Sequence, residues 1–314
     1  MRSCKKSSSA VWPATTEVSE PTDLDGTVSW RALFDETEQI LARSGVTENA
    51  RTEARWILEE VLGLSGAEFT RALDGLATER GVAHLDTLVA RRSGGEPIQY
   101  VLGHWPFRNI DLLVDQRVLI PRPETEIVAG LAIDELDRIR PEGNATVIDL
   151  GTGSGAIGLS IAQERPTTRV LLTDVSSEAL AVARANLAGL GIVGGGVEIA
   201  EGSWFEAVPE RFRGECDVII SNPPYIPDSD DLDASVTDWE PQSALFAGDD
   251  GRRDLDVIVP SAAGWLRPGG SLVLEMDPRQ TTAISEVGRT YGFECSVHAD
   301  LAGHDRAVVL RKSI

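Results

Sequence analysis

Hydrophobic residues recur at helical spacing in the segment that starts at Ser29, a residue suited to cap a helix. Three short stripes follow one another along the chain. They consist of Trp30, Leu33, Phe34, Ile40 and Leu41; of Ala54, Ile57, Leu58, Val61 and Leu62; and of Leu85, Leu88 and Val89. Because short amphipathic helices bury their apolar faces by packing together, residues 29–93 are predicted to form a small helical domain.

The helical pattern ends at the glycines and proline of residues 93–97. Aromatic and β-branched residues then alternate with turn formers through residues 98–120, which is typical of extended chain or a hairpin. Residues 94–122 are therefore predicted to be a connector. Residues 1–28 are rich in Ser, Thr, Pro and acids without periodicity, so we expect a disordered leader there.

Beyond Pro141, strand-like apolar runs alternate with helical stretches. The runs cover 146–148, 170–172, 197–200, 218–220 and 271–274, and the helical stretches cover 156 to about 164 and 177–190. Such alternation predicts βαβ units. The expected fold class is therefore α/β, with a Rossmann-like parallel sheet that has helices on both faces and occupies residues 123–314.

Composition and charge narrow the classes of function. The 314 residues are 42% hydrophobic, and 50 acidic against 29 basic residues leave a formal net charge of -21. Nucleic acid and anionic membranes are held by Lys and Arg, so both are poor candidates for a partner. No apolar run has the length of a membrane helix or a signal peptide, and we expect a cytoplasmic monomer.

The cysteines and histidines show no spacing typical of a site. Cys4, Cys216 and Cys295 are odd in number and far apart, and the four histidines form no pair on one helix face. We therefore expect neither a disulfide framework nor a bound metal.

A glycine-rich loop separates the first strand-like run from the helix after it. Residues 147–156 read Val-Ile-Asp-Leu-Gly-Thr-Gly-Ser-Gly-Ala. Glycine allows the sharp turn and lets a ligand lie against the backbone, although many such turns are purely structural. The next run ends at Asp174, about 20 residues on, where a carboxylate can accept both hydroxyls of a ribose. The loop and the acid together predict a ligand that contains adenosine.

The choice between NAD and S-adenosylmethionine depends on phosphates. The spacing G-x-G-x-G departs from the dinucleotide pattern G-x-G-x-x-G. A pyrophosphate needs a helix N-terminus, whereas a sulfonium and an amino-acid end favour nearby carboxylates. Asp149 is placed to face the methionine ammonium, directly or through water. These points favour S-adenosylmethionine as the cofactor.

The sequence Asn222-Pro223-Pro224-Tyr225 follows the strand-like run at 218–220. Ligands of open α/β sheets bind at the carboxyl ends of strands, so this turn is expected beside the cofactor. The prolines fix the backbone and leave the Pro223 carbonyl without a neighbouring amide donor. Asn222 adds a side-chain acceptor, and Tyr225 adds a ring that can stack on a planar group. The alternative is a structural Pro-Pro turn.

This arrangement suits the methylation of a planar nitrogen. The lone pair of an amide or exocyclic amine is delocalised, so the nitrogen is a poor nucleophile. Two acceptors that grip its N–H bonds orient it and compensate the positive charge that develops during attack on the methyl group. The reaction therefore needs no strong general base.

These segments resemble the N(5)-glutamine methyltransferases that modify the Gly-Gly-Gln motif of bacterial peptide chain release factors. The resemblance runs from about Ser29 to the C-terminus and implies a class I methyltransferase sheet. It rests on residues 119–126 (Leu-Ile-Pro-Arg-Pro-Glu-Thr-Glu), 149–155, 221–227, 240–241 with 244–245, and 300–303 with 305–306.

The resemblance also implies roles for particular residues. The cofactor would be lined by Gly151, Thr152, Gly153, Ser154 and Gly155, with Asp174 on the ribose, Trp204 beside the adenine and Asn222 adjacent. Asn222, Pro223, Pro224 and Tyr225 would hold the glutamine amide, with Asn222, Pro223 and Tyr225 as catalytic residues. Phe107 would wall the pocket where glutamine meets the methyl group, although Phe107 and Trp204 are also plausible core aromatics.

Two further segments qualify the resemblance. Arg122, Glu124 and Glu126 are expected to form a salt-bridged brace instead of contacting a ligand. Residues 275–278 read Glu-Met-Asp-Pro where relatives usually carry Glu-Ile-Gly, so the local turn is expected to differ.

Other substrates stay open at this point. The motif of residues 222–225 is shared with methyltransferases that act on adenine in DNA or RNA. Residues 226–256, however, hold ten acids and two arginines, which repels phosphate and suits a basic protein surface. A ribosomal protein is an alternative substrate, and a cofactor-binding protein without catalysis is a third hypothesis. The expected partner is a release factor, with no direct contact to nucleic acid or membrane.

Overall fold

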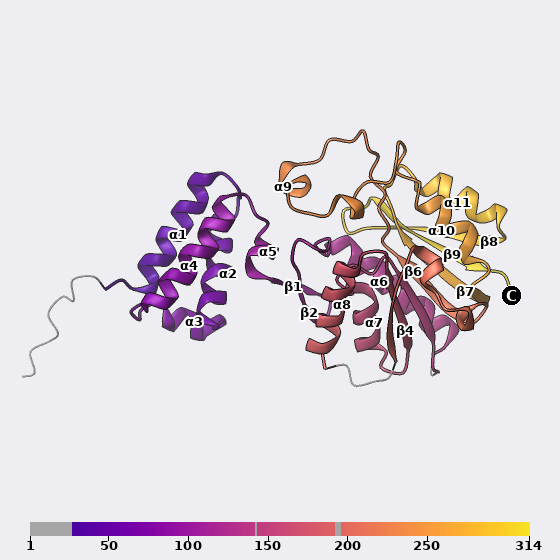
Figure 1. Ribbon diagram of the computed structural model, residues 1–314, viewed down its shortest axis with the longest axis horizontal. Helices are drawn as coiled ribbons and strands as arrows, with labels where there is room; N and C mark the ends of the chain where they lie inside the picture. The colour runs from indigo at the N-terminus through magenta and orange to yellow at the C-terminus, as the bar shows by residue number, and fades with distance from the viewer. Residues whose placement is uncertain (1–26, 142, 192–195) are drawn as a thin grey trace, which may run out of the picture.

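The computed structural model describes residues 27–141, 143–191 and 196–314. A helical bundle and a larger α/β part are joined by a short connector (Figure 1). A leader was expected over residues 1–28. Residues 1–26 lie outside the described residues, so the structure describes only the last two positions of that segment. In the described ranges, no helix has both the length and the apolar character that crossing a membrane requires.

The bundle contains four helices where the apolar stripes predicted three. They are α1 (Trp30–Ser44), α2 (Ala50–Leu62), α3 (Gly66–Ala72) and α4 (Glu79–Ser93). As expected, Ser29 caps α1, because its hydroxyl accepts from the Ala32 backbone N–H at 3.2 Å. The sequence pattern missed α3 because it has seven residues and buries only Phe69, too few positions for a period to show.

The connector contains a short helix, which was not predicted, and the hairpin, which was. They are α5 (Ile98–Leu102), β1 (His104–Phe107) and β2 (Ile110–Leu113). Ile98 and Val101 pack into the bundle core, whereas Tyr100 belongs to the core of the α/β part and donates its hydroxyl to the Val118 carbonyl at 2.5 Å. One helical turn therefore faces both parts, which an extended strand could not do at this spacing.

The α/β part confirms the predicted fold class. Its seven-stranded sheet has the order β5-β4-β3-β6-β7-β9-β8. The strands are β3 (Thr146–Leu150), β4 (Arg169–Asp174), β5 (Val197–Glu201), β6 (Cys216–Ser221), β7 (Leu266–Glu275), β8 (Phe293–Ala299) and β9 (Asp305–Lys312). The first five are parallel, and β9 pairs antiparallel with both β7 and β8. The pattern of alternating elements did not predict these last two strands.

Helices cover both faces of the sheet, as expected (Figure 1). They are α6 (Pro123–Ile139), α7 (Ala156–Glu164), α8 (Ser177–Gly189), α10 (Leu255–Ala262) and α11 (Thr281–Thr290). Val218 and Ile220 of β6 join the core with α6, α7 and α8, whereas Ile219 joins the core with α10 and α11. Successive side chains of a strand point to opposite faces, so one continuous apolar run serves two cores.

The chain reverses its direction of winding at the centre of the sheet. Strand β3 pairs with β4 on one side and with β6 on the other, and Leu150 lies opposite Ser221. The loops after β3, β4 and β6 therefore meet at one edge. This is the position where open α/β sheets bind ligands.

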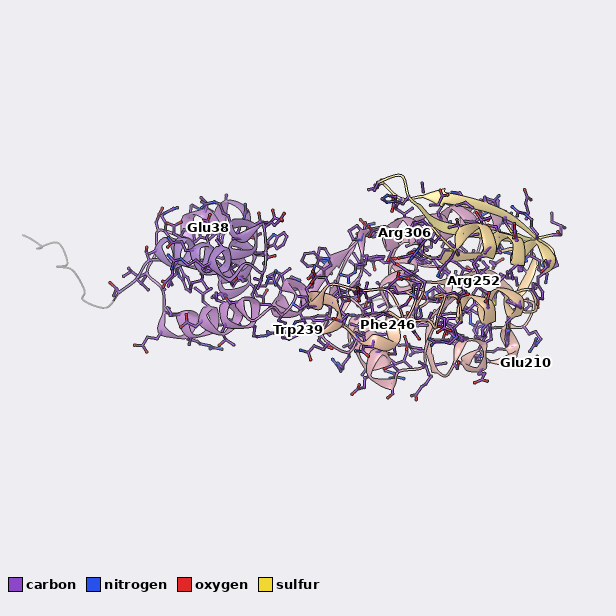
Figure 2. All side chains as sticks on the ribbon, turned by 90° about the horizontal axis from the view of Figure 1, so that it is seen from above. Glu38, Glu210, Trp239, Phe246, Arg252 and Arg306 are labelled. Atoms are coloured by element: carbon purple, nitrogen blue, oxygen red, sulfur yellow. The ribbon has the colours of Figure 1, made fainter. Side chains whose placement is uncertain are left out.

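Short elements follow β5 and β6. They are the 3-10 turns η1 (Trp204–Ala207), η2 (Glu210–Phe212) and η3 (Gln242–Ala244) and the helix α9 (Ala234–Thr237). In Figure 2, Trp239 lies near the junction with the bundle. A Cβ atom on Gly95 would lie 3.9 Å from the Trp239 ring nitrogen, so residues 226–254 reach from the sheet edge to the end of the bundle.

Candidate active site

The glycine loop after β3 adopts a conformation that few other residues tolerate. Gly151, Gly153 and Gly155 have φ values of 69°, 55° and 87°, in the left-handed region. A Cβ atom on Gly151 would lie 3.3 Å from the Trp204 ring, so the ring packs directly against this backbone. The three glycines are therefore required by the turn itself and by the close approach of Trp204.

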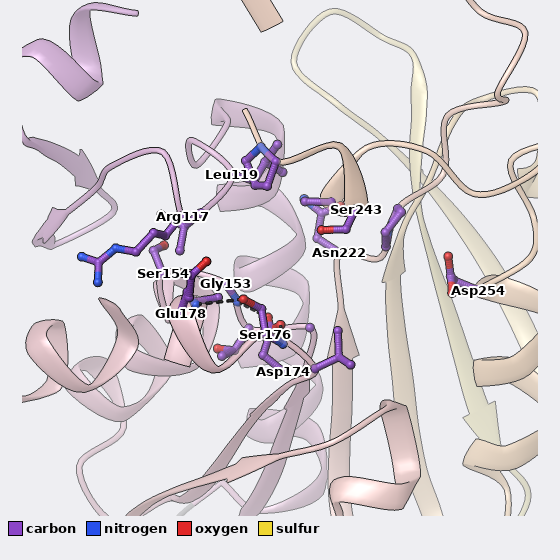
Figure 3. Close-up of a pocket in the computed structure, with 18 of the residues that line it drawn as sticks. Arg117, Leu119, Gly153, Ser154, Asp174, Ser176, Glu178, Asn222, Ser243 and Asp254 are labelled. Atoms are coloured by element: carbon purple, nitrogen blue, oxygen red, sulfur yellow. Dashed lines mark hydrogen bonds between the residues drawn. The ribbon is translucent and has the colours of Figure 1, made fainter. Parts of the chain in front are cut away.

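Asp174 ends β4 and is bound to the glycine loop. Its Oδ2 accepts from the Gly153 backbone N–H and its Oδ1 from that of Ser176, both at 2.9 Å (Figure 3). Burial raises its pKa, and the backbone hydrogen bonds oppose that shift. The sequence spacing predicted that the glycine loop and Asp174 act together. The structure brings them into contact, and both line the same cavity.

Asp149 lies behind the loop, outside the cavity lining. It is fully buried, and its Oδ2 accepts from the Thr152 hydroxyl at 2.6 Å and from the Gly158 backbone N–H at 2.9 Å. Burial raises its pKa to about 6, against the effect of these two hydrogen bonds. Asp149 therefore braces the loop, whereas the sequence suggested that it faces the ligand.

A cavity of about 1110 Å³ joins the glycine loop to the segment after β6. In Figure 3, Asp174 lies on one side of it and Asn222 lies near Ser243 on the other. The expected site residues that line it are Gly151, Thr152, Gly153, Ser154, Asp174, Trp204, Asn222 and Pro224. Gly155, Pro223, Tyr225 and Phe107 are not among its lining residues.

Phe107 lies in the core. It is 1% exposed and packs in the cluster that contains α6 and α7, which agrees with its alternative interpretation as a core aromatic. Trp204 is half-buried, contacts the second core and also lines the cavity. Its φ of 44° is unusual for a residue with a side chain. The fold therefore holds Trp204 against the glycine loop despite a strained backbone.

Asn222 presents its side chain at the cavity with a defined partner behind it. Its Nδ2 donates to the Thr125 hydroxyl oxygen at 3.2 Å. Since this contact uses the NH2 group, the amide oxygen is available to a ligand. In the described part of the chain, no donor reaches the Pro223 carbonyl, and the next residue, Pro224, has no N–H.

Tyr225 does not line the cavity. Its hydroxyl donates to Glu275 Oε1 at 3.2 Å, and its ring packs against the core that contains α10 and α11. Burial raises the pKa of the Tyr225 phenol, as does the adjacent Glu275 carboxylate. The expected stacking of this ring on a substrate amide therefore has no support in the geometry and stays a prediction.

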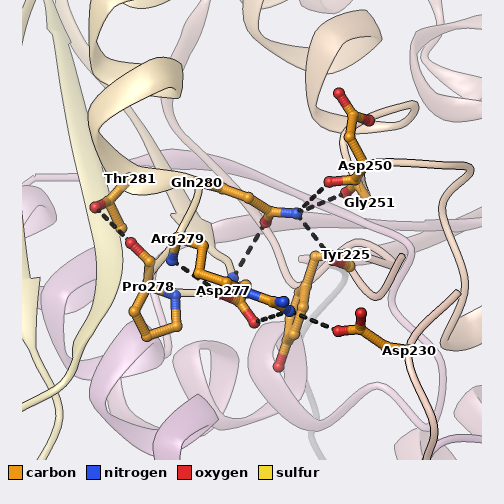
Figure 4. A network of polar contacts seen from close by, with 9 residues as sticks. All are labelled: Tyr225, Asp230, Asp250, Gly251, Asp277, Pro278, Arg279, Gln280 and Thr281. Carbon is orange, nitrogen blue, oxygen red and sulfur yellow. Dashed lines mark hydrogen bonds and ion pairs between the residues drawn. The ribbon is translucent and has the colours of Figure 1, made fainter. Parts of the chain in front are cut away.

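Residues 277–280 overlap the segment 275–278, where a departure from the family pattern is expected, and their side chains hold neighbouring loops together (Figure 4). The Gln280 Nε2 donates to the carbonyls of Tyr225 at 2.9 Å, Gly251 at 3.0 Å and Asp250 at 3.2 Å. Arg279 pairs with Asp230 at 2.7 Å. This turn thus ties the segment after β7 to both ends of residues 225–251, and its difference from the turn of relatives stays a prediction.

The expected salt-bridged brace is present only in part: among the described residues Arg122 forms an ion pair, whereas Glu124 and Glu126 form none. Arg122 pairs with Glu240, which is 4% exposed and also accepts from the Ile120 backbone N–H at 3.0 Å. Glu126 accepts from the Arg108 backbone N–H at 3.1 Å. The two segments quoted for the resemblance around Arg122 and Glu240 are therefore in direct contact.

Sequence reasoning missed two residues behind Asn222. Thr125, in the first turn of α6, is 4% exposed, and Glu275, at the end of β7, is 1% exposed. Burial raises the pKa of Glu275 to about 7, whereas hydrogen bonding from Thr125 and Tyr225 lowers it. Both lie in segments that the sequence analysis compared with the family pattern, residues 119–126 and 275–278. No local spacing relates either residue to Asn222.

Comparison with known proteins supports one family over nearly the whole chain. A release factor glutamine methyltransferase of Deinococcus radiodurans is 36% identical over 285 residues, which cover 90% of this chain and 98% of the relative. One of Geobacter sulfurreducens is 38% identical, covering 88% and 95%. The chain belongs to the release factor glutamine methyltransferase family. Membership confirms the resemblance, the enzyme class and S-adenosylmethionine as the cofactor of the class.

Family models divide the match between the two parts of the fold. The PrmC N-terminal domain matches residues 32–103, and the methyltransferase small domain matches residues 131–238. Among solved structures, the hMettl16 catalytic domain has a TM-score of 0.50 at 14% identity, covering 76% of this chain and 84% of that one, and shows the fold alone. A release-factor-specific protein-(glutamine-N5) methyltransferase of Alicyclobacillus acidocaldarius has a TM-score of 0.40 at 27% identity, covering 62% and 95%.

Proposed function

We propose that this family member transfers a methyl group from S-adenosylmethionine to the side-chain amide nitrogen of the glutamine in the Gly-Gly-Gln motif of release factors. The observation that carries the proposal is the position of Asn222. Its amide lies in the same cavity as Asp174 and the glycine loop, with the NH2 group held from behind. A free oxygen acceptor therefore lies at the meeting point of cofactor and substrate.

The residues of the cavity fit the cofactor. Gly151 and Gly153 keep side chains away from the loop surface, and the Asp174 carboxylate lines the cavity beside them. Asp174 would hold the ribose hydroxyls and Trp204 the adenine, with Thr152 and Ser154 along the chain of the ligand. Bound there, S-adenosylmethionine supplies an electrophilic methyl group on a sulfonium.

Asn222 and Pro223 would bind and orient the glutamine amide. The Asn222 side-chain oxygen and the Pro223 carbonyl are acceptors for the two N–H bonds of the amide nitrogen. Gripping both bonds aligns the nitrogen for attack and stabilises the positive charge that develops on it. Pro224 lines the cavity and keeps the turn rigid. Attack would form the N–C bond as the C–S bond breaks, with S-adenosylhomocysteine as the leaving group, and the nitrogen, then strongly acidic, would lose one proton to water.

The bundle and residues 226–254 are proposed to recognise the release factor. We propose that residues 29–93 form the recognition domain, 94–122 the connector and 123–314 the methyltransferase domain, active as a monomer in the cytoplasm, where translation ends. Trp239 lies near Gly95 at the end of the bundle, so the two proposed recognition elements meet there, and residues of 226–254 also line the cavity.

The acidic run divides into structural and exposed carboxylates. Glu240 and Asp254 are buried, and Asp230 pairs with Arg279. The exposed acids with no arginine partner in the described residues are Asp228, Asp231, Asp233, Asp238, Asp249 and Asp250. These remain to attract a basic surface of the release factor. They also disfavour adenine methylation, because a nucleic acid would bring phosphates to the same rim.

This charge argument predicts an effect of salt. Raising the salt concentration should increase the KM for the release factor and leave the KM for S-adenosylmethionine nearly constant, because exposed charges are screened within about 8 Å at physiological ionic strength. Steady-state methyl transfer at several salt concentrations measures both. A KM for release factor that does not respond to salt contradicts this part of the proposal.

A methyl-transfer assay tests the function itself. Purified release factor, its Gln→Ala variant in the Gly-Gly-Gln motif, a ribosomal protein fraction and duplex DNA are each incubated with labelled S-adenosylmethionine, and labelled protein is mapped by mass spectrometry. We expect a methylated glutamine in the release factor and no label in its variant. Unlabelled release factor, or equal labelling of DNA, overturns the proposal. Label confined to a ribosomal protein assigns the amide chemistry to another substrate.

A further inference from the structure

A row of neighbouring polar side chains, contributed by three segments of the fold, lies behind Asn222. The Thr125 hydroxyl oxygen, in the first turn of α6, accepts from the Asn222 NH2 group at 3.2 Å. The carboxyl of Glu275, at the end of β7, lies beside Thr125, whose hydroxyl lowers the pKa of that carboxyl. Glu275 Oε1 accepts from the Tyr225 hydroxyl at 3.2 Å. These side chains bring together the ends of neighbouring strands β6 and β7 and the start of α6.

The order of donors and acceptors in this row fixes the orientation of an amide. A hydroxyl has one hydrogen to donate. Glu275 Oε2 is buried and has no hydrogen-bond partner among the described residues, so in the ionised carboxyl it is the unused acceptor beside that hydrogen. The Thr125 oxygen must then accept from Asn222, which turns the Asn222 NH2 group inward and its oxygen toward the cavity. The reversed amide would set two lone-pair oxygens against each other.

We propose that Thr125 and Glu275 are positioning residues that keep the oxygen of Asn222 facing the substrate amide. The inference rests on the proposed function, in which that oxygen accepts from the glutamine nitrogen. Without the hydroxyl, Asn222 can rotate and present NH2 to the substrate, where it would repel an N–H donor. Catalysis would fall although the cavity kept its shape.

The packing of Thr125 allows a test that separates the hydroxyl from its bulk. The Thr125 backbone is held independently, because its N–H donates to the Arg122 carbonyl at 3.1 Å. Thr125→Val keeps the shape and removes the hydroxyl, whereas Thr125→Ser keeps the hydroxyl. Thr290→Val, at the exposed end of α11, is the matched control, since the Thr290 hydroxyl bonds only the Val287 carbonyl.

We expect Thr125→Val to lower kcat for release factor methylation by about 10- to 100-fold, because misplaced reacting groups cost rates of this size. The KM for S-adenosylmethionine should stay within about twofold, and Thr125→Ser should restore most of kcat. Glu275→Leu should act through the same bond, so the double variant should be little slower than the slower single variant. Equal losses in Thr125→Val and Thr125→Ser, or independent effects in the double variant, overturn the proposal.

A second measurement does not depend on activity. In protein labelled with 15N-asparagine, the Asn222 side-chain amide signals are assigned by their loss in Asn222→Asp. We expect Thr125→Val and Glu275→Leu to shift them and to speed their hydrogen exchange, and Thr125→Ser to leave them near their native positions. Unchanged signals in Thr125→Val overturn the inference even if the variant unfolds more easily. Failure of the native enzyme to methylate the release factor would instead refute the proposed function while these signals still test the orientation of Asn222.

Discussion

The two segments that meet at the cavity are built in different ways, and we call them the cofactor wall and the substrate wall after the roles proposed for them. The cofactor wall, residues 151–155 with Asp174, is one loop closed by a hydrogen bond between residues 21 positions apart. The substrate wall, residues 222–225, is held by Thr125, Glu275 and Gln280, which lie 97, 50 and 55 positions from their partners. Backbone conformation shapes the first wall, and side chains from distant segments position the second.

This difference in construction indicates which property of the enzyme each wall controls. The shape of the cofactor wall comes mainly from its own backbone, because its glycines adopt the left-handed turn without strain, and Asp149 and Asn186 support that turn from behind. The substrate wall must present one acceptor in one orientation, which requires several supports at once. We therefore expect changes in the cofactor wall to alter cofactor affinity alone, and changes in the substrate wall to alter the rate.

The largest expected effect is that of Asn222→Ala, which removes the acceptor of the substrate wall. The value of kcat for release factor should fall by about 100- to 1000-fold, as when one preorganised group is removed from an active site. Binding of S-adenosylhomocysteine, measured by calorimetry, should change little. A variant that retained its methyl transfer would show that Asn222 has no catalytic role and would remove the contrast between the walls.

Asp174→Ala tests the cofactor wall. It removes a carboxylate that bonds two backbone N–H groups, so the KM for S-adenosylmethionine should rise by about 10- to 100-fold, as expected for charged hydrogen bonds. The rate at saturating cofactor should stay within a few-fold. The control is Glu201→Ala. Glu201 is an exposed acid on β5, directly opposite Asp174 of β4 in the sheet register. If kcat fell as much as affinity, the proposed division of roles would be wrong.

Gln280→Leu tests the support of the substrate wall at a distance. It removes the hydrogen bonds to three carbonyls, and the free energy of unfolding should fall by about 1–3 kcal/mol because buried acceptors lose their donor. The KM for release factor should rise a few-fold, while cofactor binding stays unchanged. Urea unfolding and steady-state kinetics measure these effects, with Gln39→Leu on the exposed face of α1 as control. Weaker cofactor binding would contradict the separation of the walls.

The last expected effect, which leaves methyl transfer out, is a difference in the pH dependence of stability between the two walls. Burial raises the pKa of Asp149 to about 6 and that of Glu275 to about 7, above the ordinary values of 3.8 and 4.5. A raised pKa means that the folded chain keeps the proton longer. The stability from each group is full below the ordinary pKa and is lost as pH rises through the folded pKa, with a slope of at most about 1.4 kcal/mol per pH unit.

Unfolding of the native chain, Asp149→Asn and Glu275→Gln at a series of pH values checks this. Relative to Asp149→Asn, the native chain should lose stability between about pH 4 and 6, and relative to Glu275→Gln between about pH 4.5 and 7. Parallel pH profiles for the native chain and the Glu275→Gln variant would mean that Glu275 is not buried as the structure shows.

The sequence determined the local features of this protein. The glycine spacing and the acid 21 positions later predicted the cofactor wall, because a turn and a strand end are set by neighbouring residues. The alternating apolar runs predicted the parallel strands and the helices on both faces. The hydrophobic pattern of a helix or strand repeats about every two to four residues. This repeat is shorter than the helix or strand itself, so the pattern can be recognised in the sequence.

Only the tertiary structure decided which residues support the site. It placed Asp149 behind the loop and Phe107 in the core, turned Tyr225 toward Glu275, and brought Thr125 and Gln280 to the substrate wall. It also added the short helices α3 and α5, the helices α6, α10 and α11 of the α/β part, and the antiparallel strands β8 and β9. The physical reason is that burial and hydrogen bonding between distant segments depend on how the sheet and helices pack, and no local spacing records that packing.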